Sequence, residues 1–108
     1  MDRRHMIFAA AAVAAASVAA PGSAQVTGDR ALGQYLSSEC VTCHQLTGKQ
    51  QPGIPAIDGK PAASLVEQLN AYRTKQRPNE VMQNIAARLS SDDIAALAVY
   101  FSSLKPRN

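Results

Sequence analysis

The sequence predicts an all-α domain of three to four short helices. Apolar residues recur at helical spacing in four stretches, and no stretch alternates apolar with polar residues as a half-buried strand would. Residues 46–60 are rich in glycine and proline and predict an irregular loop between the first helical stretch and the others. No internal repeat is present. The chain is therefore expected to form one small helical domain.

Residues 1–24 have the layout of a secretory signal peptide. Basic residues precede an apolar, alanine-rich run over residues 6–20, and small residues stand before the expected cleavage site after Ala24. This run of about 15 residues is shorter than the roughly 20 that a membrane-spanning helix needs, although an uncleaved anchor is the alternative. We therefore expect cleavage of residues 1–24, export to the periplasm, and a mature domain of residues 25–108 with no membrane span.

The mature chain is small and only mildly basic. It holds nine Lys and Arg residues against seven Asp and Glu residues, a net charge of about +2. A nucleic-acid binder would show a dense basic face or aromatic stacking platforms, so we expect no nucleic-acid partner. The charge is compatible with weak docking to an acidic protein. So short a chain buries a modest core and benefits from a metal, a disulfide or a covalent cofactor.

The first helix is expected over Thr27–Glu39. Ala31, Leu32 and Leu36 recur at helical spacing, and Asp29 suits the N-cap or the first turn. This helix leads directly into a motif of two cysteines and a histidine.

Three further helices are expected after the irregular loop. The first of them covers residues 62–74, and a brief helical pattern follows Met82. The last helix begins after Ser90, which is expected to form a capping box with Asp93, and it ends before Lys105-Pro106.

The stretch Cys40-Val41-Thr42-Cys43-His44 suggests three kinds of site. A structural zinc site usually needs four Cys or His ligands, and the mature chain offers only these three. A redox dithiol or a disulfide would leave His44 without a role. One haem c uses all three residues, because Cys40 and Cys43 can form thioethers with the porphyrin vinyl groups while His44 coordinates the iron. We therefore expect one covalently bound haem c.

The second axial ligand of the iron decides between an electron carrier and an enzyme. Met82 is the one methionine of the mature chain, and thioether sulfur suits haem iron. Met82 could instead fill the core, which is the usual role of methionine, and Lys49 or Lys75 are remote alternative ligands. With His44 and Met82 both bound, the iron could only exchange an electron.

In these residues the chain resembles the class I c-type cytochromes, especially the short bacterial ones that carry a single haem. The resemblance extends from about Thr27 to Leu104 and is most specific in the Cys40–His44 motif. It also includes three longer stretches: residues 53–61, 65–73 and 82–101.

The resemblance implies a cytochrome c-like fold around the haem. It assigns the thioethers to Cys40 and Cys43 and the axial ligands to His44 and Met82. It matches Pro55 to the proline whose carbonyl accepts a hydrogen bond from the ligand histidine, a contact that orients the ring.

The resemblance also implies a close contact between helices, and further side chains are expected around the haem. The glycine and apolar residue that pack the first helix across the last would be Gly33 and Leu36, against Tyr100 or Phe101.

Tyr72 and Arg73 could reach a haem propionate, although a tyrosine in an apolar stripe is more often a core residue. The haem would be buried, which raises its reduction potential, among Leu65, Leu69, Tyr72, Ile85 and Leu97. The loops near the haem edge carry charges that either are solvated or orient a partner: Lys49, Lys60, Lys75 and Arg77.

Three functions stay in competition. The first is a periplasmic monohaem cytochrome that transfers single electrons between a redox donor and acceptor by transient docking, and that is not itself an enzyme. The second is a fixed cytochrome subunit of a periplasmic dehydrogenase that oxidises a sulfur compound or an alcohol. The third, a haem enzyme or gas sensor, requires that Met82 does not bind the iron.

Overall fold

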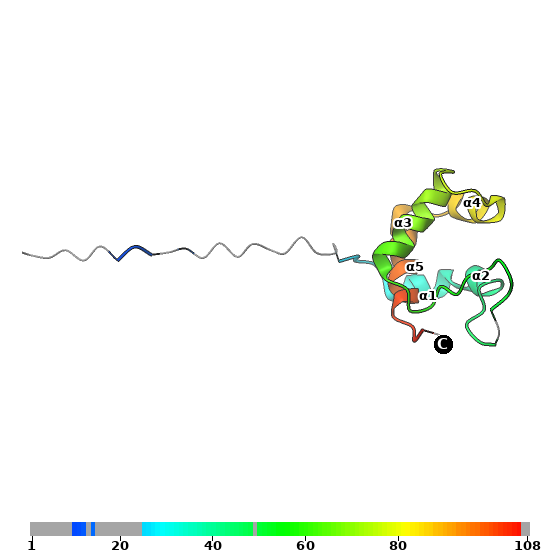
Figure 1. Ribbon diagram of the computed structural model, residues 1–108, viewed down its shortest axis with the longest axis horizontal. Coiled ribbons are helices and arrows are strands. Elements are labelled where there is room, and N and C mark those ends of the chain that lie inside the picture. Colours follow the sequence, from blue (N-terminus) through cyan, green and yellow to red (C-terminus); the bar gives the residue numbers. More distant parts are fainter. Residues whose placement is uncertain (1–9, 13, 15–24, 49, 107–108) are drawn as a thin grey trace, which may run out of the picture.

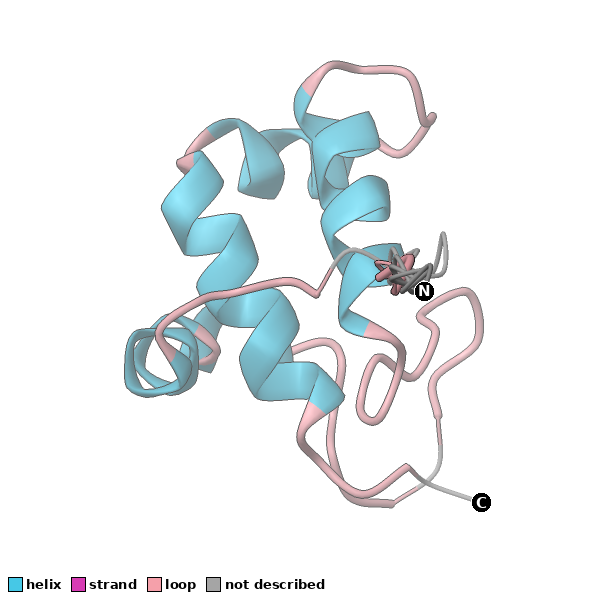
Figure 2. Ribbon diagram, turned by 90° about the vertical axis from the view of Figure 1, so that its left-hand side faces the viewer, coloured by secondary structure: helices cyan, strands magenta, loops and turns pink. Residues whose placement is uncertain are grey.

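Five helices make up the regular structure of the described residues, which contain no strand (Figures 1 and 2). The computed structural model describes residues 10–12, 14, 25–48 and 50–106. The all-α prediction is confirmed, with five segments in place of three to four. The helices are α1 (Arg30–Leu36), α2 (Ser38–Val41), α3 (Ala62–Arg73), α4 (Glu80–Ala87) and α5 (Ser91–Ser102).

The expected signal peptide lies mostly outside the described residues, as does its cleavage site after Ala24. None of the helices that the structure describes combines the length and the apolar character needed to cross a membrane.

The expected first helix, Thr27–Glu39, is divided into α1 and α2. Asp29 is the N-cap of α1, because its carboxylate accepts hydrogen bonds from two N–H groups of the first turn at 2.9 and 3.1 Å. The helix therefore begins three residues later than expected. Buried Ser37 separates α1 from α2, and its hydroxyl donates to the Gln34 carbonyl at 2.6 Å. Such a local bond competes with regular helical pairing.

The boundaries of α3 and α5 agree closely with the sequence. Pro61 precedes α3 directly, and its carbonyl accepts from the Leu65 N–H at 3.1 Å. The predicted capping box begins α5: Ser90 Oγ accepts from the Asp93 N–H, and Asp93 Oδ2 accepts from the Ser90 N–H, each at 3.0 Å. The helix ends at Ser102, slightly earlier than expected.

The irregular loop is confirmed over residues 46–48 and 50–60. Gly59 ties its end to α5, since the Gly59 N–H donates to the Phe101 carbonyl at 2.8 Å. Gly59 has a φ of 71°, and an added Cβ would lie 2.8 Å from Pro106 Cδ. Both the backbone angle and the space therefore require glycine here.

The first and last helices cross at Gly33, as expected. A Cβ on Gly33 would lie 2.6 Å from the carbonyl carbon of Ala96 and 2.8 Å from Tyr100 Cβ. Leu36 packs against the buried apolar cluster that includes Tyr100. A second close approach was not predicted: a Cβ on Gly28 would lie 2.6 Å from the Ala95 carbonyl carbon. Two glycines thus allow the backbone before and within α1 to approach α5.

The helices form a curved row with α5 at its centre. In Figure 1, α1 packs on α5, α5 packs on α3, and each end is extended, by α2 beyond α1 and by α4 beyond α3. The two end helices, α2 and α4, do not pack against each other. Among the described residues, α5 supplies six of the eight buried apolar side chains. The core therefore lies along α5, and the row is open between its ends.

Candidate functional site

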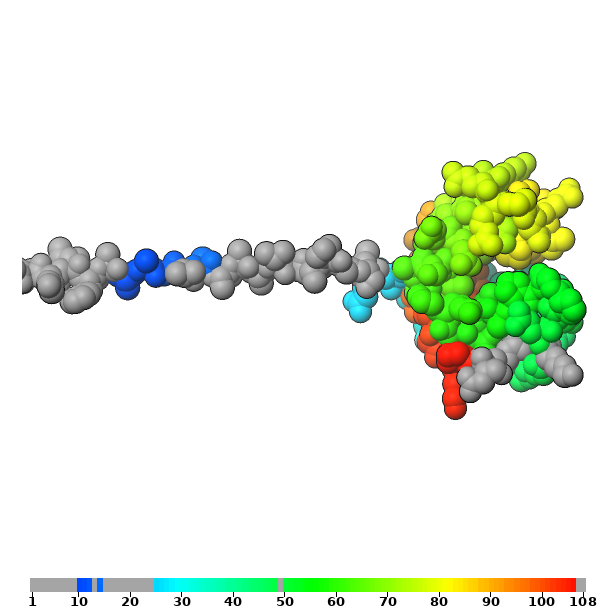
Figure 3. Space-filling view, in the orientation of Figure 1, coloured from blue at the N-terminus to red at the C-terminus, as the bar shows by residue number. Residues whose placement is uncertain are grey.

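A cleft of about 380 Å³ opens between the two ends of this row. Its walls come from α2 and the following loop on one side, and from α3, α4 and α5 on the other. In Figure 3 it opens between the loop around Gly53 (green) and α4 (yellow). The residues that the sequence suggested for the thioethers, the axial ligands and the hydrogen bond to the histidine all line it: Cys40, Cys43, His44, Pro55 and Met82. Arg73 and Lys75, which the sequence also suggested, do not, and Lys49 lies outside the described residues.

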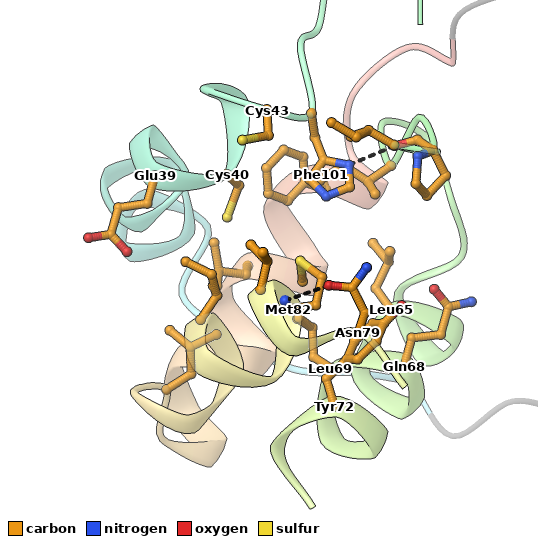
Figure 4. A pocket seen from close by; sticks show the side chains of 18 of the residues that line it. Glu39, Cys40, Cys43, Leu65, Gln68, Leu69, Tyr72, Asn79, Met82 and Phe101 are labelled. Carbon is orange, nitrogen blue, oxygen red and sulfur yellow. Dashed lines mark hydrogen bonds between the residues drawn. The ribbon is translucent and has the colours of Figure 1, made fainter. Parts of the chain in front are cut away.

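The short helix α2 and the turn after it present the two cysteines to the cleft. The N–H groups of Cys43 and His44 both donate to the Cys40 carbonyl, at 3.2 and 2.8 Å, so all three side chains leave one tight turn. Figure 4 shows both thiols on the same side of the cleft. Cys40 is half-buried, Cys43 is exposed, and no disulfide joins them.

The environment of Cys40 does not suit a thiolate. Burial, and after it the negative charge of Glu39, raises the pKa of the Cys40 thiol to about 11. Redox-active cysteines have lowered pKa values, and zinc binds the deprotonated form. A neutral thiol is instead what thioether formation consumes, because S–H adds across a vinyl double bond. The raised pKa argues against the dithiol alternative. The zinc alternative lacks ligands, because no three His, Cys, Asp or Glu side chains of the described residues are grouped so as to hold a metal ion.

The His44 ring is held by the backbone of the loop. Its Nδ1 lies 2.7 Å from the Pro55 carbonyl oxygen. A carbonyl can only accept, so Nδ1 carries a proton, and in the neutral ring Nε2 then keeps its lone pair. His44 is therefore in the tautomer that can coordinate a metal through Nε2.

Met82 reaches the cleft from the first turn of α4. The sequence placed it before the helix, but α4 begins at Glu80 because Asn79 caps it: Asn79 Oδ1 accepts from the Met82 N–H at 3.0 Å. Figure 4 shows this bond beside the Met82 thioether. The cap makes the backbone of Met82 part of a regular helix and so limits where its sulfur can lie.

The remaining wall is largely apolar. It includes all five side chains that the sequence suggested would surround a haem, of which Leu65 and Leu97 are buried. Phe101, which is also buried, lies on the same wall. A flat apolar macrocycle could pack against these groups and fill the cleft. Two thiols, an imidazole with a free Nε2, a thioether and an apolar wall fit a covalently attached haem.

Several cleft residues were missed by sequence reasoning. Asn79 could have been found as a cap, since it follows Pro78 and precedes a helical pattern. The others carry no local signal and are known only from the fold: Glu39, Ile54, Gln68, Val81, Leu89, Ala98 and Phe101.

Comparison with known proteins agrees with this site. The chain matches the family "Cytochrome c" over residues 30–105. Over 72 residues it is 38% identical to the "Thiosulfate dehydrogenase electron acceptor" of Thiomonas intermedia, covering 65% of this chain and 33% of that protein. Over 90 residues it is 31% identical to the "Cytochrome subunit of sulfide dehydrogenase" of Chlorobaculum tepidum, covering 83% of this chain and 80% of that protein.

Among solved structures, reduced recombinant cytochrome c4 from Pseudomonas stutzeri superposes with a TM-score of 0.60 at 27% identity. The match covers 78% of this chain and 54% of the c4 chain. The chain thus spans about a third of the Thiomonas protein and about half of the c4 structure. From its sequence, its helices and its cleft, the chain belongs to the cytochrome c family, whose cofactor is a covalently bound haem c.

Proposed function

We propose that this protein is an exported monohaem cytochrome that transfers single electrons between redox proteins and catalyses no reaction of its own. In this proposal Cys40 and Cys43 hold the haem through thioethers, and His44 and Met82 bind the iron. Pro55 keeps the His44 ring in place through the 2.7 Å hydrogen bond. Bound in this way, the haem supplies a one-electron couple.

One observation carries the proposal: His44 and Met82, which belong to distant segments, line the same cleft. His44 follows α2, whereas Met82 belongs to α4, and these helices do not pack on each other. His44 from one end of the row of helices and Met82 from the other would fill the two axial positions of the iron. Neither oxygen nor peroxide could then readily bind, which argues against a haem enzyme or gas sensor.

Replacing Met82 with alanine tests this assignment. The variant should lose the long-wavelength absorption band of methionine bound to ferric haem, and its ferrous form should gain carbon monoxide binding, because one axial position becomes vacant. Visible spectra of the oxidised, reduced and carbon monoxide-treated protein measure both changes. Val81→Ala, a truncation one residue away on the same cleft wall, should leave the spectra unchanged. An unchanged Met82→Ala spectrum without carbon monoxide binding would show that Met82 is not the ligand.

A fixed enzyme subunit is the second candidate, because the Chlorobaculum relative is named as one. A permanent interface should contain a contiguous apolar patch. Among the described residues the exposed large apolar side chains are Tyr35 and Val81, 78% and 67% exposed, and they lie on α1 and α4, which do not pack together. This distribution favours transient docking.

Purification from the periplasm distinguishes the two candidates. A free carrier should elute from a sizing column without a partner, with its N-terminus at Gln25 and one haem attached, since we expect cleavage after Ala24. Mass spectrometry of the eluted protein gives both the N-terminus and the added haem. Stoichiometric co-elution with a larger flavin, molybdenum or quinone protein would contradict the free-carrier proposal.

A further inference from the structure

We propose that Arg77, held against Tyr72, is the cation that faces the haem propionates and raises the reduction potential. This inference rests on the proposed haem attachment through Cys40 and Cys43. The orientation of the haem in the cleft follows from its own chemistry, because the two vinyl groups lie on one half of the macrocycle and the two propionates on the other. If the vinyl groups lie at the cysteines, the propionates lie toward the opposite side of the cleft.

That opposite side of the cleft includes polar side chains among its apolar ones. Figure 4 shows Cys40 and Cys43 on one side, and Gln68 and Tyr72 on the other. Arg77 also lines the cleft, whereas the lining carboxylate, Glu39, is next to Cys40 in the sequence and lies on the cysteine side. A propionate directed away from the cysteines would thus meet a guanidinium and an amide.

A second hollow, of about 420 Å³, adjoins the cleft on this side. Arg77 and Gln68 line both spaces, and Lys60 and Ser64 line the second one alone. No Asp or Glu side chain lines the second hollow. The cleft is largely apolar, and the second hollow beside it offers cations and hydrogen-bond donors. This pair of spaces suits a haem, which is an apolar macrocycle with two carboxylates at one edge.

Arg77 is positioned by several contacts. Its guanidinium carbon lies 4.8 Å from the centroid of the Tyr72 ring, within the range of a cation–π contact. Its N–H donates to the Ala71 carbonyl at 3.2 Å, and its carbonyl accepts from Gln83 Nε2 at 2.8 Å. The turn before it includes Lys75 with a φ of 63°, which reverses the chain after α3. The backbone and the ring together hold the guanidinium at the cleft.

The neighbouring arginines are engaged elsewhere. Arg73, suggested by the sequence as a propionate contact, donates to Asn70 Oδ1 at 2.7 Å and to the Leu89 carbonyl at 3.3 Å, and so ties α3 to the end of α4. Arg88 pairs with Glu39 at 3.5 Å, the one ion pair within the described residues. Arg77 therefore has no carboxylate partner in the described part of the chain and remains available to the cofactor.

A guanidinium beside a propionate offsets the negative charge near the iron. Because the ferric centre carries one more positive charge than the ferrous centre, a nearby cation favours the reduced state. Removing the cation should lower the potential while leaving both axial ligands in place.

The test compares Arg77→Gln with Lys75→Gln in the haem-loaded protein. Each removes one positive charge, but Lys75 lines neither space. At neutral pH, and in equilibrium with a redox couple of fixed potential, the ratio of reduced to oxidised Arg77→Gln protein should fall about threefold or more below wild type. The ratio for Lys75→Gln should change by less than about half of that, because the Lys75 side chain does not face the space in which the propionates would lie. Visible spectroscopy measures each ratio and confirms that the methionine band persists.

Arg77→Lys provides the conservative comparison. This variant keeps the positive charge, so its ratio of reduced to oxidised protein should return most of the way to the wild-type ratio. An Arg77→Gln ratio no lower than that of Lys75→Gln, or an Arg77→Lys ratio as low as that of Arg77→Gln, would overturn the proposal. Absence of a pyridine haemochrome signal from the wild type would instead show that haem attachment itself is wrong, so the two failures are distinguishable.

Discussion

Replacing Gly33 with valine is expected to cause the largest loss of stability of any single substitution proposed for this chain. The added side chain would overlap the Ala96 backbone, and its first carbon would lie only 2.8 Å from Tyr100 Cβ. Neither helix can move away, because α1 rests on the core along α5. Overpacking of this kind costs about 3 kcal/mol or more, a large share of the stability of a small domain.

Urea unfolding followed by far-ultraviolet circular dichroism measures the Gly33 effect. Gln34→Val is the matched control, since it introduces the same β-branched residue at the next, exposed position of α1. Its cost should stay within about 1 kcal/mol. Equal stability of the two variants would contradict the close helix crossing.

The double substitution Cys40→Ala and Cys43→Ala is expected to abolish haem retention. Without thioethers, haem should separate from the chain under denaturing conditions, and the haem stain of a denaturing gel should fall by about tenfold or more. The unloaded chain should also fold poorly, because the cleft walls would face water. Each single variant can keep one thioether and should retain part of the stain.

Thr42→Ala is the control for the cysteine experiment. Thr42 lies between the cysteines but does not line the cleft, and its hydroxyl donates only to the Ser38 carbonyl, at 3.1 Å. This variant should keep its haem. Full retention of stain by the double cysteine variant would mean that haem is not attached through this motif.

Local signals in the sequence predicted much of the fold. The Asp29 cap, the capping box of Ser90 and Asp93, and the loop of glycines and prolines are decided within a few residues, and each is present in the structure. The motif from Cys40 to His44 was equally local. Two boundaries were wrong: the division of the first helix into α1 and α2, and the start of α4, where the contribution of Asn79 as a cap was overlooked.

The polar part of the cleft could not be predicted from sequence. Arg73 and Arg77 are both candidates on the basis of residue type and position. Which of them faces the cleft depends on the turn at Lys75 and on the Tyr72 ring, and Arg73 instead bonds to residues beyond α4. The approach of Gly28 to Ala95 likewise depends on how two distant segments cross. Such facts belong to tertiary packing, which no short window of sequence contains.

The location of the core along α5 couples two properties that an engineer would want to adjust separately. Leu65, Leu97, Ala98 and Phe101 belong both to the buried cluster and to the cleft wall. A substitution that enlarges or polarises this layer therefore alters the resistance of the chain to unfolding and the dielectric around the redox centre at the same time. A change confined to the rim, such as one at Arg77, offers a way to adjust the potential without exchanging the side chains that hold the helices together.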